Sequence, residues 1–311
     1  MPEALIECVP NFSEGRRPEV VESIVAAMRV EGVRLLDWSL DADHNRSVVT
    51  IAGSPAAVVE SAVRGAGRAA ELIDLTAQEG VHPRIGAADV IPFVPVSGVG
   101  LEHCVLLARQ AGTEIWKRWQ VPVYFYEAAA ARPDRAMLED VRRGQFEGLR
   151  EAVLKEPARR PDVGGPELHP TAGASAVGAR RFLIAFNLYL DTADVAVARA
   201  VAREIRHSGG GPAAVKAIGV TAHGQAQVSM NLTDFARTPV GTAFAAVQEK
   251  AKRLGTKAVR AELIGLIPEA ALERNSEWMR LLDGFQEEEK VLERRLEKPL
   301  AWPGDSGAAA V

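Results

Sequence analysis

The stretch Gly80–Val96, G-V-H-P-R-I-G-A-A-D-V-I-P-F-V-P-V, carries the residue types best suited to chemistry. It opens with a glycine-bounded loop that holds His82, Pro83 and Arg84. A proline after His82 disfavours helix there and places the histidine in extended backbone. Imidazole exchanges protons near neutral pH and guanidinium binds anions, so this loop could present a proton-transfer group beside an anion clamp. The alternative is a histidine that only hydrogen-bonds a nearby carbonyl.

The second part of this stretch, Asp89–Val96, is an apolar run of strand length. Pro92 and Pro95 interrupt it, and proline cannot donate to a ladder. We therefore expect this strand at a sheet edge, or irregular.

A polar cluster, D-A-D-H-N-R, begins at Asp41 and connects two predicted strands. Aspartate and asparagine are turn formers, so a turn is the favoured interpretation for Asp41 and Asp43. A weak metal site or substrate contacts that include His44 form the alternative. Asn45 and Arg46 are candidates for substrate contact.

A long proline- and glycine-rich segment, R-P-D-V-G-G-P-E-L-H-P-T-A-G-A, lies between the two halves of the chain. A mere linker would be polar and flexible in composition. The stiffness of this segment, and the histidine before Pro170, instead indicate a shaped loop that lets a flat ligand approach the backbone. In the second half, Asn187, Asn231 and Asp234 lie in or after apolar strands, and a ligand could satisfy such polar groups.

Hydrophobic periodicity predicts the element order β-α-β-β-α-β twice. In the first half we expect strands at 4–10, 33–40, 47–52 and 89–96, helices at 18–32 and 54–76, and an added helix 101–119 and strand 121–126. Residues 128–180 are expected to connect the halves, with one helix near 145–155. In the second half we expect strands at 181–190, 216–222, 227–232 and 259–267, and helices at 193–206, 239–254 and 278–297. This predicts an α/β (α+β) fold of duplicated ferredoxin-like subdomains, mainly antiparallel, spanning 1–180 and 181–298, with 299–311 a disordered tail.

The totals fit a soluble, cytoplasmic globular protein. The 311 residues are 47% hydrophobic with a net charge of −4, which argues against nucleic-acid or anionic-membrane binding. The two cysteines, Cys8 and Cys104, lie in apolar segments and suit a reducing compartment. No signal peptide or membrane-spanning run is evident. Phosphate-binding loop, nucleophile-elbow and zinc motifs are missing, so no metal is expected.

Several long blocks resemble the glutamate formiminotransferase family: L-I-E-C-V-P-N-F-S-E-G, the His82 loop with its strand, G-A-R-R-F-L-I-A-F-N-L and Q-V-S-M-N-L-T-D-F. The resemblance covers Met1 to about Glu297. It implies two α/β subdomains whose sheets form a folate-binding cleft, and a domain that is usually a homodimer. It also implies transfer of the formimino group of N-formimino-L-glutamate to N5 of tetrahydrofolate in histidine breakdown.

The family's catalytic histidine falls on His82. By the same resemblance the folate site would be lined by residues of the linking loop, namely Val163, Gly164, His169, Pro170, Thr171, Ala172 and Gly173. The carboxylates of both substrates require cations, and Arg46, Arg84 and Arg180 are the candidates. An acidic residue of vertebrate members is replaced here by Ser39, so its role could have passed to Asp41 or Asp43 or been lost.

Three other functions remain open from the sequence. The first is formyl transfer from N-formylglutamate to tetrahydrofolate, which would use the same fold. The second is a metal-dependent amidohydrolase built on Asp41, Asp43, His44 and His82. The third is a folate-binding protein without catalysis.

Overall fold

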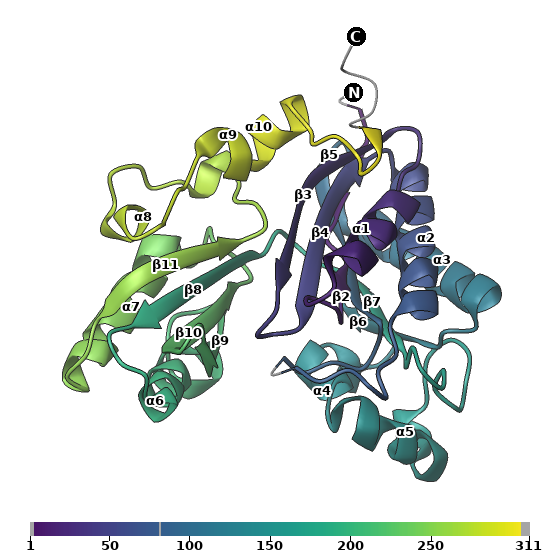
Figure 1. The fold of residues 1–311 in the computed structure, drawn as a ribbon, viewed down its shortest axis with the longest axis horizontal. Helices are drawn as coiled ribbons and strands as arrows, with labels where there is room; N and C mark the ends of the chain where they lie inside the picture. The colour runs from purple at the N-terminus through teal and green to yellow at the C-terminus, as the bar shows by residue number, and fades with distance from the viewer. Residues whose placement is uncertain (1–2, 81, 306–311) are drawn as a thin grey trace. The chain divides into compact units, whose positions relative to one another are not determined.

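The computed structural model describes residues 3–80 and 82–305. The chain divides into two compact units (Figure 1). Unit 1 runs to Arg180 and includes the segment from Pro299 onward, and unit 2 is Arg181–Lys298. Each unit buries its own hydrophobic core.

Unit 1 follows the predicted order closely. Its strands are β1 (Leu5–Cys8), β2 (Asn11–Phe12), β3 (Val33–Asp41), β4 (Arg46–Gly53), β5 (Ala88–Ser97), β6 (Val123–Glu127) and β7 (Ser175–Ala179). Its helices are α1 (Pro18–Ala27), α2 (Pro55–Leu72), α3 (Leu101–Trp119), α4 (Leu138–Val141) and α5 (Gln145–Lys155), with short 3-10 turns at Pro133–Arg135 and Pro157–Arg159. Both α1 and α2 begin with proline, which lacks the N–H that the first helical turn leaves unused.

The unit 1 sheet is built around one interrupted strand. β1 and β2 lie between β4 and β5 and pair antiparallel with both, and β3 pairs antiparallel with β4. β7 extends the sheet in parallel beside β5, and β6 pairs in parallel with β7. The helices α1, α2 and α3 lie side by side over one face (Figure 1). Of the two alternatives predicted for the proline-containing strand, the edge position is wrong, because β5 has neighbours on both sides, and the irregular strand is confirmed.

Irregular pairing is how the sheet accommodates these prolines. The register of β5 shifts against both β1 and β2, and the neighbouring strand breaks at Val9 and Pro10. Val9 N–H donates to the Pro92 carbonyl oxygen at 3.3 Å, so the break lies opposite the proline. The other departure is β7, which falls where a connecting region was expected. Its sequence S-A-V-G-A is short and lacks large apolar residues, although all five residues are buried.

Unit 2 has the predicted β-α-β-β-α-β order. Its elements are β8 (Ile184–Leu190), α6 (Val195–Ile205), β9 (Val215–Ala222), β10 (Gln225–Leu232), α7 (Val240–Arg253) and β11 (Ala258–Ile264), with a 3-10 turn at His207–Gly209. The sheet order is β11-β8-β10-β9, and every adjacent pair is antiparallel. This is the strand order of a split βαβ unit. α6 and α7 pack together on the sheet.

The C-terminal part of the chain differs from the prediction. The single helix expected at 278–297 is broken into α8 (Glu277–Arg280), α9 (Glu287–Lys290) and α10 (Leu292–Glu297), after a 3-10 turn at Glu269–Ala271. Gly284 has a φ of 63°, and Val291 leaves the helix to pair with Ile267, where it is fully buried. The chain is therefore anchored to unit 2 at a point that a continuous helix could not reach.

Residues 299–305 pack on unit 1, so the disordered tail is wrong for this segment. Leu300 N–H donates to the Leu35 carbonyl oxygen at 2.8 Å, Trp302 is buried, and Asp305 pairs with Arg29 at 2.6 Å. The remainder of the expected tail, 306–311, lies outside the described residues. Within the described ranges, no helix is long and apolar enough to cross a membrane.

Candidate functional site

His82 lies on a loop of unit 1 that meets the start of β5, and its side chain is partly buried. Its Nδ1 is 2.9 Å from the Pro83 carbonyl oxygen. A carbonyl oxygen has no proton to give, so Nδ1 is the donor and the lone pair of the neutral ring sits on Nε2. The pKa of His82 is held well below 6.5, first by burial and then by the positive charges of Arg46 and Arg142. The imidazole is therefore neutral at physiological pH, as a general base must be.

A buried charge cluster, formed by Asp89, Arg46 and Arg142, lies near His82. The Asp89 carboxylate, at 0% exposure, pairs with Arg46 at 2.8 Å and makes a second, short ion pair with Arg142. Its other oxygen accepts from the backbone N–H of Ile85 at 2.8 Å. Despite the opposing effect of burial, the two arginines and this hydrogen bond lower the Asp89 pKa to about 2. The pKa of Arg46 falls to about 10, chiefly through burial, so Asp89 and Arg46 are both charged at pH 7.

Asn45 joins three loops beside His82. Its Oδ1 accepts from Gly15 N–H at 3.0 Å, and its Nδ2 donates to the Glu79 carbonyl oxygen at 2.8 Å. Its own carbonyl oxygen accepts from the Gln78 amide at 3.1 Å. Asn45 has a φ of 47°, a region that asparagine adopts more readily than most residues. The side chain predicted to contact substrate thus ties the turn after β3 to the loops on either side.

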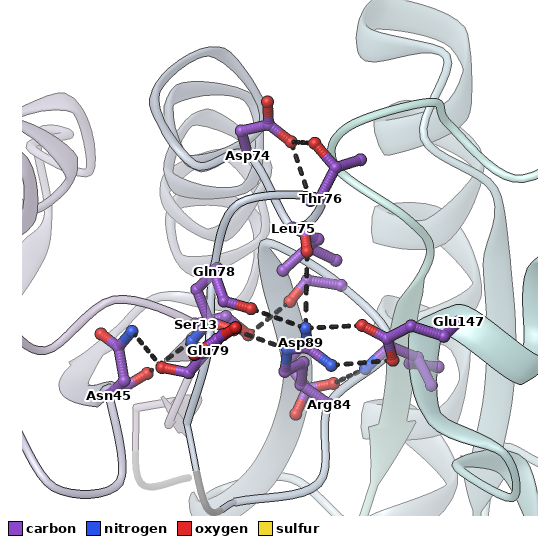
Figure 2. Close-up of polar contacts among 12 residues, drawn as sticks. Ser13, Asn45, Asp74, Leu75, Thr76, Gln78, Glu79, Arg84, Asp89 and Glu147 are labelled. Atoms are coloured by element: carbon purple, nitrogen blue, oxygen red, sulfur yellow. Dashed lines mark hydrogen bonds and ion pairs between the residues drawn. The ribbon is translucent and has the colours of Figure 1, made fainter.

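Arg84, the predicted anion clamp, is buried and bound to protein groups (Figure 2). Its guanidinium makes a two-oxygen contact with Glu147 of α5, at 2.8 and 3.1 Å. It also donates to the Gln78 side-chain oxygen at 2.6 Å and to the carbonyl oxygens of Gln78 and Leu75. Arg84 O accepts from Phe146 N–H at 2.9 Å, so backbone and side chain both fasten the His82 loop to α5.

One end of the predicted folate loop, the turn at His169–Gly173, lies against the segments on either side of His82. His169 and Gly173 form a reciprocal pair of backbone hydrogen bonds at 2.9 and 3.0 Å. His169 Nδ1 accepts from Ala172 N–H at 3.0 Å, and burial lowers the pKa of this histidine. Ala174 N–H donates to the Ile85 carbonyl oxygen, and Leu75 N–H donates to the carbonyl oxygen of Thr171, both at 2.9 Å. The His169–Gly173 turn, which includes Pro170, is therefore hydrogen-bonded to the segment that carries His82.

The other end of that loop lies elsewhere in unit 1. Val163 pairs with Val123 of β6. Gly164 has a φ of 77°, and a Cβ placed there would lie 2.4 Å from the Trp116 ring. Arg180 ends unit 1 just after β7, and its N–H donates to the carbonyl oxygen of Phe93 at 3.1 Å. The structure thus places Asn45, Arg46, Arg84 and the His169–Gly173 turn in contact with the segment that carries His82 or with the strand that follows it. Val163 instead pairs with β6, and Arg180 N–H pairs with β5.

The cluster after β3 is a turn, as the favoured interpretation predicts. Asp41 accepts from the His44 backbone N–H and from its Nδ1, both at 2.8 Å. The structure shows among its described residues no group of three or more His, Cys, Asp or Glu side chains placed to hold a metal ion. In unit 2, Asn187 donates to Glu262 at 3.2 Å.

Two members of the charge cluster were not predicted as site residues. Asp89 opens an apolar strand, and a carboxylate at the start of a buried run is a usable sequence signal for an ion pair. Arg142 follows α4 in a stretch of mixed charges that has no periodicity to mark it. Together these residues hold the neutral imidazole of His82 on a loop that Arg84 fastens to α5, an arrangement suited to proton transfer.

Comparison with known proteins identifies the class to which these two units belong. The N-terminal subdomain model of the formiminotransferase domain matches residues 5–180, and the formiminotransferase domain model matches residues 185–294. The chain therefore belongs to the formiminotransferase family.

The relatives are similar over almost the whole chain. A glutamate formimidoyltransferase of Streptococcus pyogenes is 42% identical over 94% of this chain and 98% of its own length. A glutamate formimidoyltransferase of Thermoplasma acidophilum is 43% identical over 95% of this chain and 98% of its own length. The formimidoyltransferase-cyclodeaminase of mouse is 41% identical over 86% of this chain, but the match spans only 51% of that longer protein.

Proposed function

We propose that this protein is a glutamate formimidoyltransferase. It would transfer the formimino group of N-formimino-L-glutamate to N5 of tetrahydrofolate and release L-glutamate, a step of histidine degradation. The observation that carries the proposal is the similarity, over 98% of their length, to relatives that bear this name. The neutral, braced imidazole of His82 supplies a group that the reaction needs.

Proton transfer by His82 is the proposed chemical role of this site. N5 of the reduced folate attacks the amidine carbon and must lose a proton as the tetrahedral intermediate forms. His82 Nε2 carries the lone pair of the neutral ring and accepts that proton. Such general base catalysis contributes about 10²–10⁴-fold, and holding the two reactants in place contributes further.

The predicted binding residues receive more specific roles from their contacts. Asn45, Arg46 and Arg84 are engaged by protein groups, so we propose that they shape the site around His82. The turn at His169–Gly173 offers backbone next to the His82 loop, where a flat pterin ring could approach closely. Arg180 and the Val163–Gly164 segment are proposed contacts for substrate carboxylates and for folate, respectively.

An assay with two donors tests this function. Purified protein is mixed with tetrahydrofolate and either N-formimino-L-glutamate or N-formylglutamate, and the substituted folate is followed by absorbance. Transfer from the formimino donor supports the proposal, whereas transfer from the formyl donor alone replaces the substrate. A His82→Ala variant should bind folate as before and lose about 10²–10⁴-fold in single-turnover rate. Full turnover by a folded variant would refute the role of His82.

Location and assembly are proposed from the sequence. Cys8 and Cys104 are buried free thiols, which is consistent with a cytoplasmic protein. The family resemblance favours a homodimer, and light scattering of the purified protein would measure its mass.

A further inference from the structure

A second imidazole lies beside His82. The rings of His44 and His82 meet edge to face, with centroids 6.3 Å apart and planes at 62°. The His44 side chain is 14% exposed and comes from the turn between β3 and β4, whereas His82 comes from the loop before β5. Two separate segments of the chain thus deliver two proton-exchanging groups to one place.

The orientation of His44 is set by Asp41. One carboxylate oxygen accepts from the His44 backbone N–H and the other from Nδ1, each at 2.8 Å. Because Asp41 occupies Nδ1, the ring nitrogen that can meet a substrate is Nε2. The pattern repeats at His82, where the Pro83 carbonyl oxygen occupies Nδ1.

The turn that carries His44 is held rigidly. A Cβ on Gly15 would lie 2.1 Å from the Asp41 carbonyl oxygen, and one on Gly80 would lie 2.6 Å from that of His44. The turn is therefore packed between the two neighbouring loops at backbone distance. Asn45 hydrogen-bonds both sides, to Gly15 N–H and to the Glu79 carbonyl oxygen.

We propose that His44 is a catalytic acid that protonates the departing glutamate nitrogen, while His82 acts as the base. The inference rests on the proposed formimino transfer. N5 forms its bond to the amidine carbon and gives its proton to His82 Nε2. The bond between that carbon and the glutamate nitrogen then breaks, and the electron pair stays on the nitrogen. A proton arrives from Nε2 of His44, which enters this step doubly protonated because its Nδ1–H is bound to Asp41.

The two nitrogens that exchange protons are bonded to the same carbon, so one imidazole on each side of that carbon can serve both. After turnover His82 returns its proton to water and His44 takes one up, which restores the starting state without any other reactant. Arg46 and Arg142 face His82 and disfavour its protonated form, whereas the carboxylate of Asp41 faces His44.

Substitution of His44 tests this assignment. His44→Gln should lower the single-turnover rate by about 10²-fold or more, with the KM for both substrates little changed. Added imidazole should restore part of the lost rate in His44→Ala, where the truncated side chain leaves space for it. It should leave the rate of the wild-type protein unchanged. His103→Gln, the same change at an exposed position of α3, is the matched control and should keep the wild-type rate. Asp41→Asn should lose rate to a smaller degree, because its one amide oxygen can still accept from Nδ1 but not from the His44 backbone N–H as well.

The outcomes distinguish failure of the role proposed for His44 from failure of the proposed formimino transfer. If the wild type transfers neither group to tetrahydrofolate, the proposed function fails. If the wild type is active and folded His44→Gln retains its single-turnover rate, the function stands and the role of His44 is refuted. A rate loss in His44→Ala that imidazole does not relieve, accompanied by a lower thermal midpoint, would show that the histidine only supports the turn and would overturn the proposal.

Discussion

Replacing Asp89 by asparagine removes the one negative charge in the cluster behind His82. The carboxylate is fully buried and balances the guanidiniums of Arg46 and Arg142. An asparagine of the same shape has one acceptor, and its NH₂ group would face the donors of Ile85 or of an arginine. Breaking a buried ion pair by removing one partner costs about 3–5 kcal/mol. We expect Asp89→Asn to lose at least that much, a large part of the 5–15 kcal/mol typical of a domain.

Urea unfolding at pH 7 measures this loss. Tryptophan fluorescence reports mainly on unit 1, which contains four of the five tryptophans, Trp38, Trp116, Trp119 and Trp302. Asp134→Asn is the matched control, because Asp134 pairs with Arg132 in an exposed position and its loss should leave the midpoint unchanged. An Asp89→Asn midpoint equal to the wild type would refute the reasoning that the buried carboxylate holds the two arginines.

The pH dependence of this effect follows from the direction of the pKa shift. The Asp89 pKa is lowered from 3.8 to about 2, so the folded state prefers the carboxylate. Its stabilisation is present above about pH 3.8 and is lost as the pH falls through about 2. The difference in unfolding free energy between wild type and Asp89→Asn should therefore be constant near neutral pH and shrink in that acidic window.

Two further predictions concern the surroundings of His82, and a third concerns Gly164 at the other end of the linking loop. Arg142→Gln removes one of the charges that lower the His82 pKa, so the acid limb of kcat/KM should move to higher pH, and an unmoved limb would contradict the assigned cause. Arg84→Lys cannot contact both oxygens of Glu147, so the thermal midpoint and the transfer rate should both fall, and unchanged values for both would show that the brace is dispensable. Gly164→Ala should destabilise the protein by about 1–3 kcal/mol, because its φ is 77° and the new methyl group would meet Trp116. In contrast, Gly148→Ala in α5, where nothing lies within 4 Å, should stabilise it by about 0.5–1 kcal/mol, and equal effects of the two changes would count against the packing argument.

The part of unit 2 from β8 to β11 could be predicted from the sequence because its pattern and its packing agree. Apolar residues at helical spacing mark α6 and α7, and runs of strand length mark the strands between them. Local preference and global fold point the same way there, and the boundaries fall within a few residues of those expected.

The sheet of unit 1 shows where local pattern is insufficient. β7 is a short segment, S-A-V-G-A, that lacks large apolar residues, and its pairing with β5 and β6 makes it a strand. Pro92 indicated either an edge strand or an irregular one. β5 is internal and irregular, and its partner strand breaks opposite the proline. Such a break involves residues more than eighty positions apart and cannot be read locally.

The sequence indicated which residues of the site could do chemistry, but it did not indicate which groups they would contact. The loop with His82 is evident from its spacing, and the structure places it beside the turn with His44 and the loop with His169. Arg84 was expected to bind a substrate anion, but the anion it contacts is Glu147, a residue of an ordinary helical pattern. A guanidinium requires an acceptor, and the sequence does not tell whether the protein or a ligand supplies it.

The ratio of charges in the buried cluster connects its stability to its function. A buried ion pair is poor evidence for stability, since apolar residues of the same volume often serve as well. Here one carboxylate, Asp89, faces two guanidiniums, so the cluster keeps an excess of positive charge beside His82. Burial alone already disfavours the imidazolium, and this excess adds to it, while Asp89 acts in the opposite direction. A one-to-one pair would leave the imidazole easier to protonate, so the second arginine, Arg142, is the component that an apolar core could not replace.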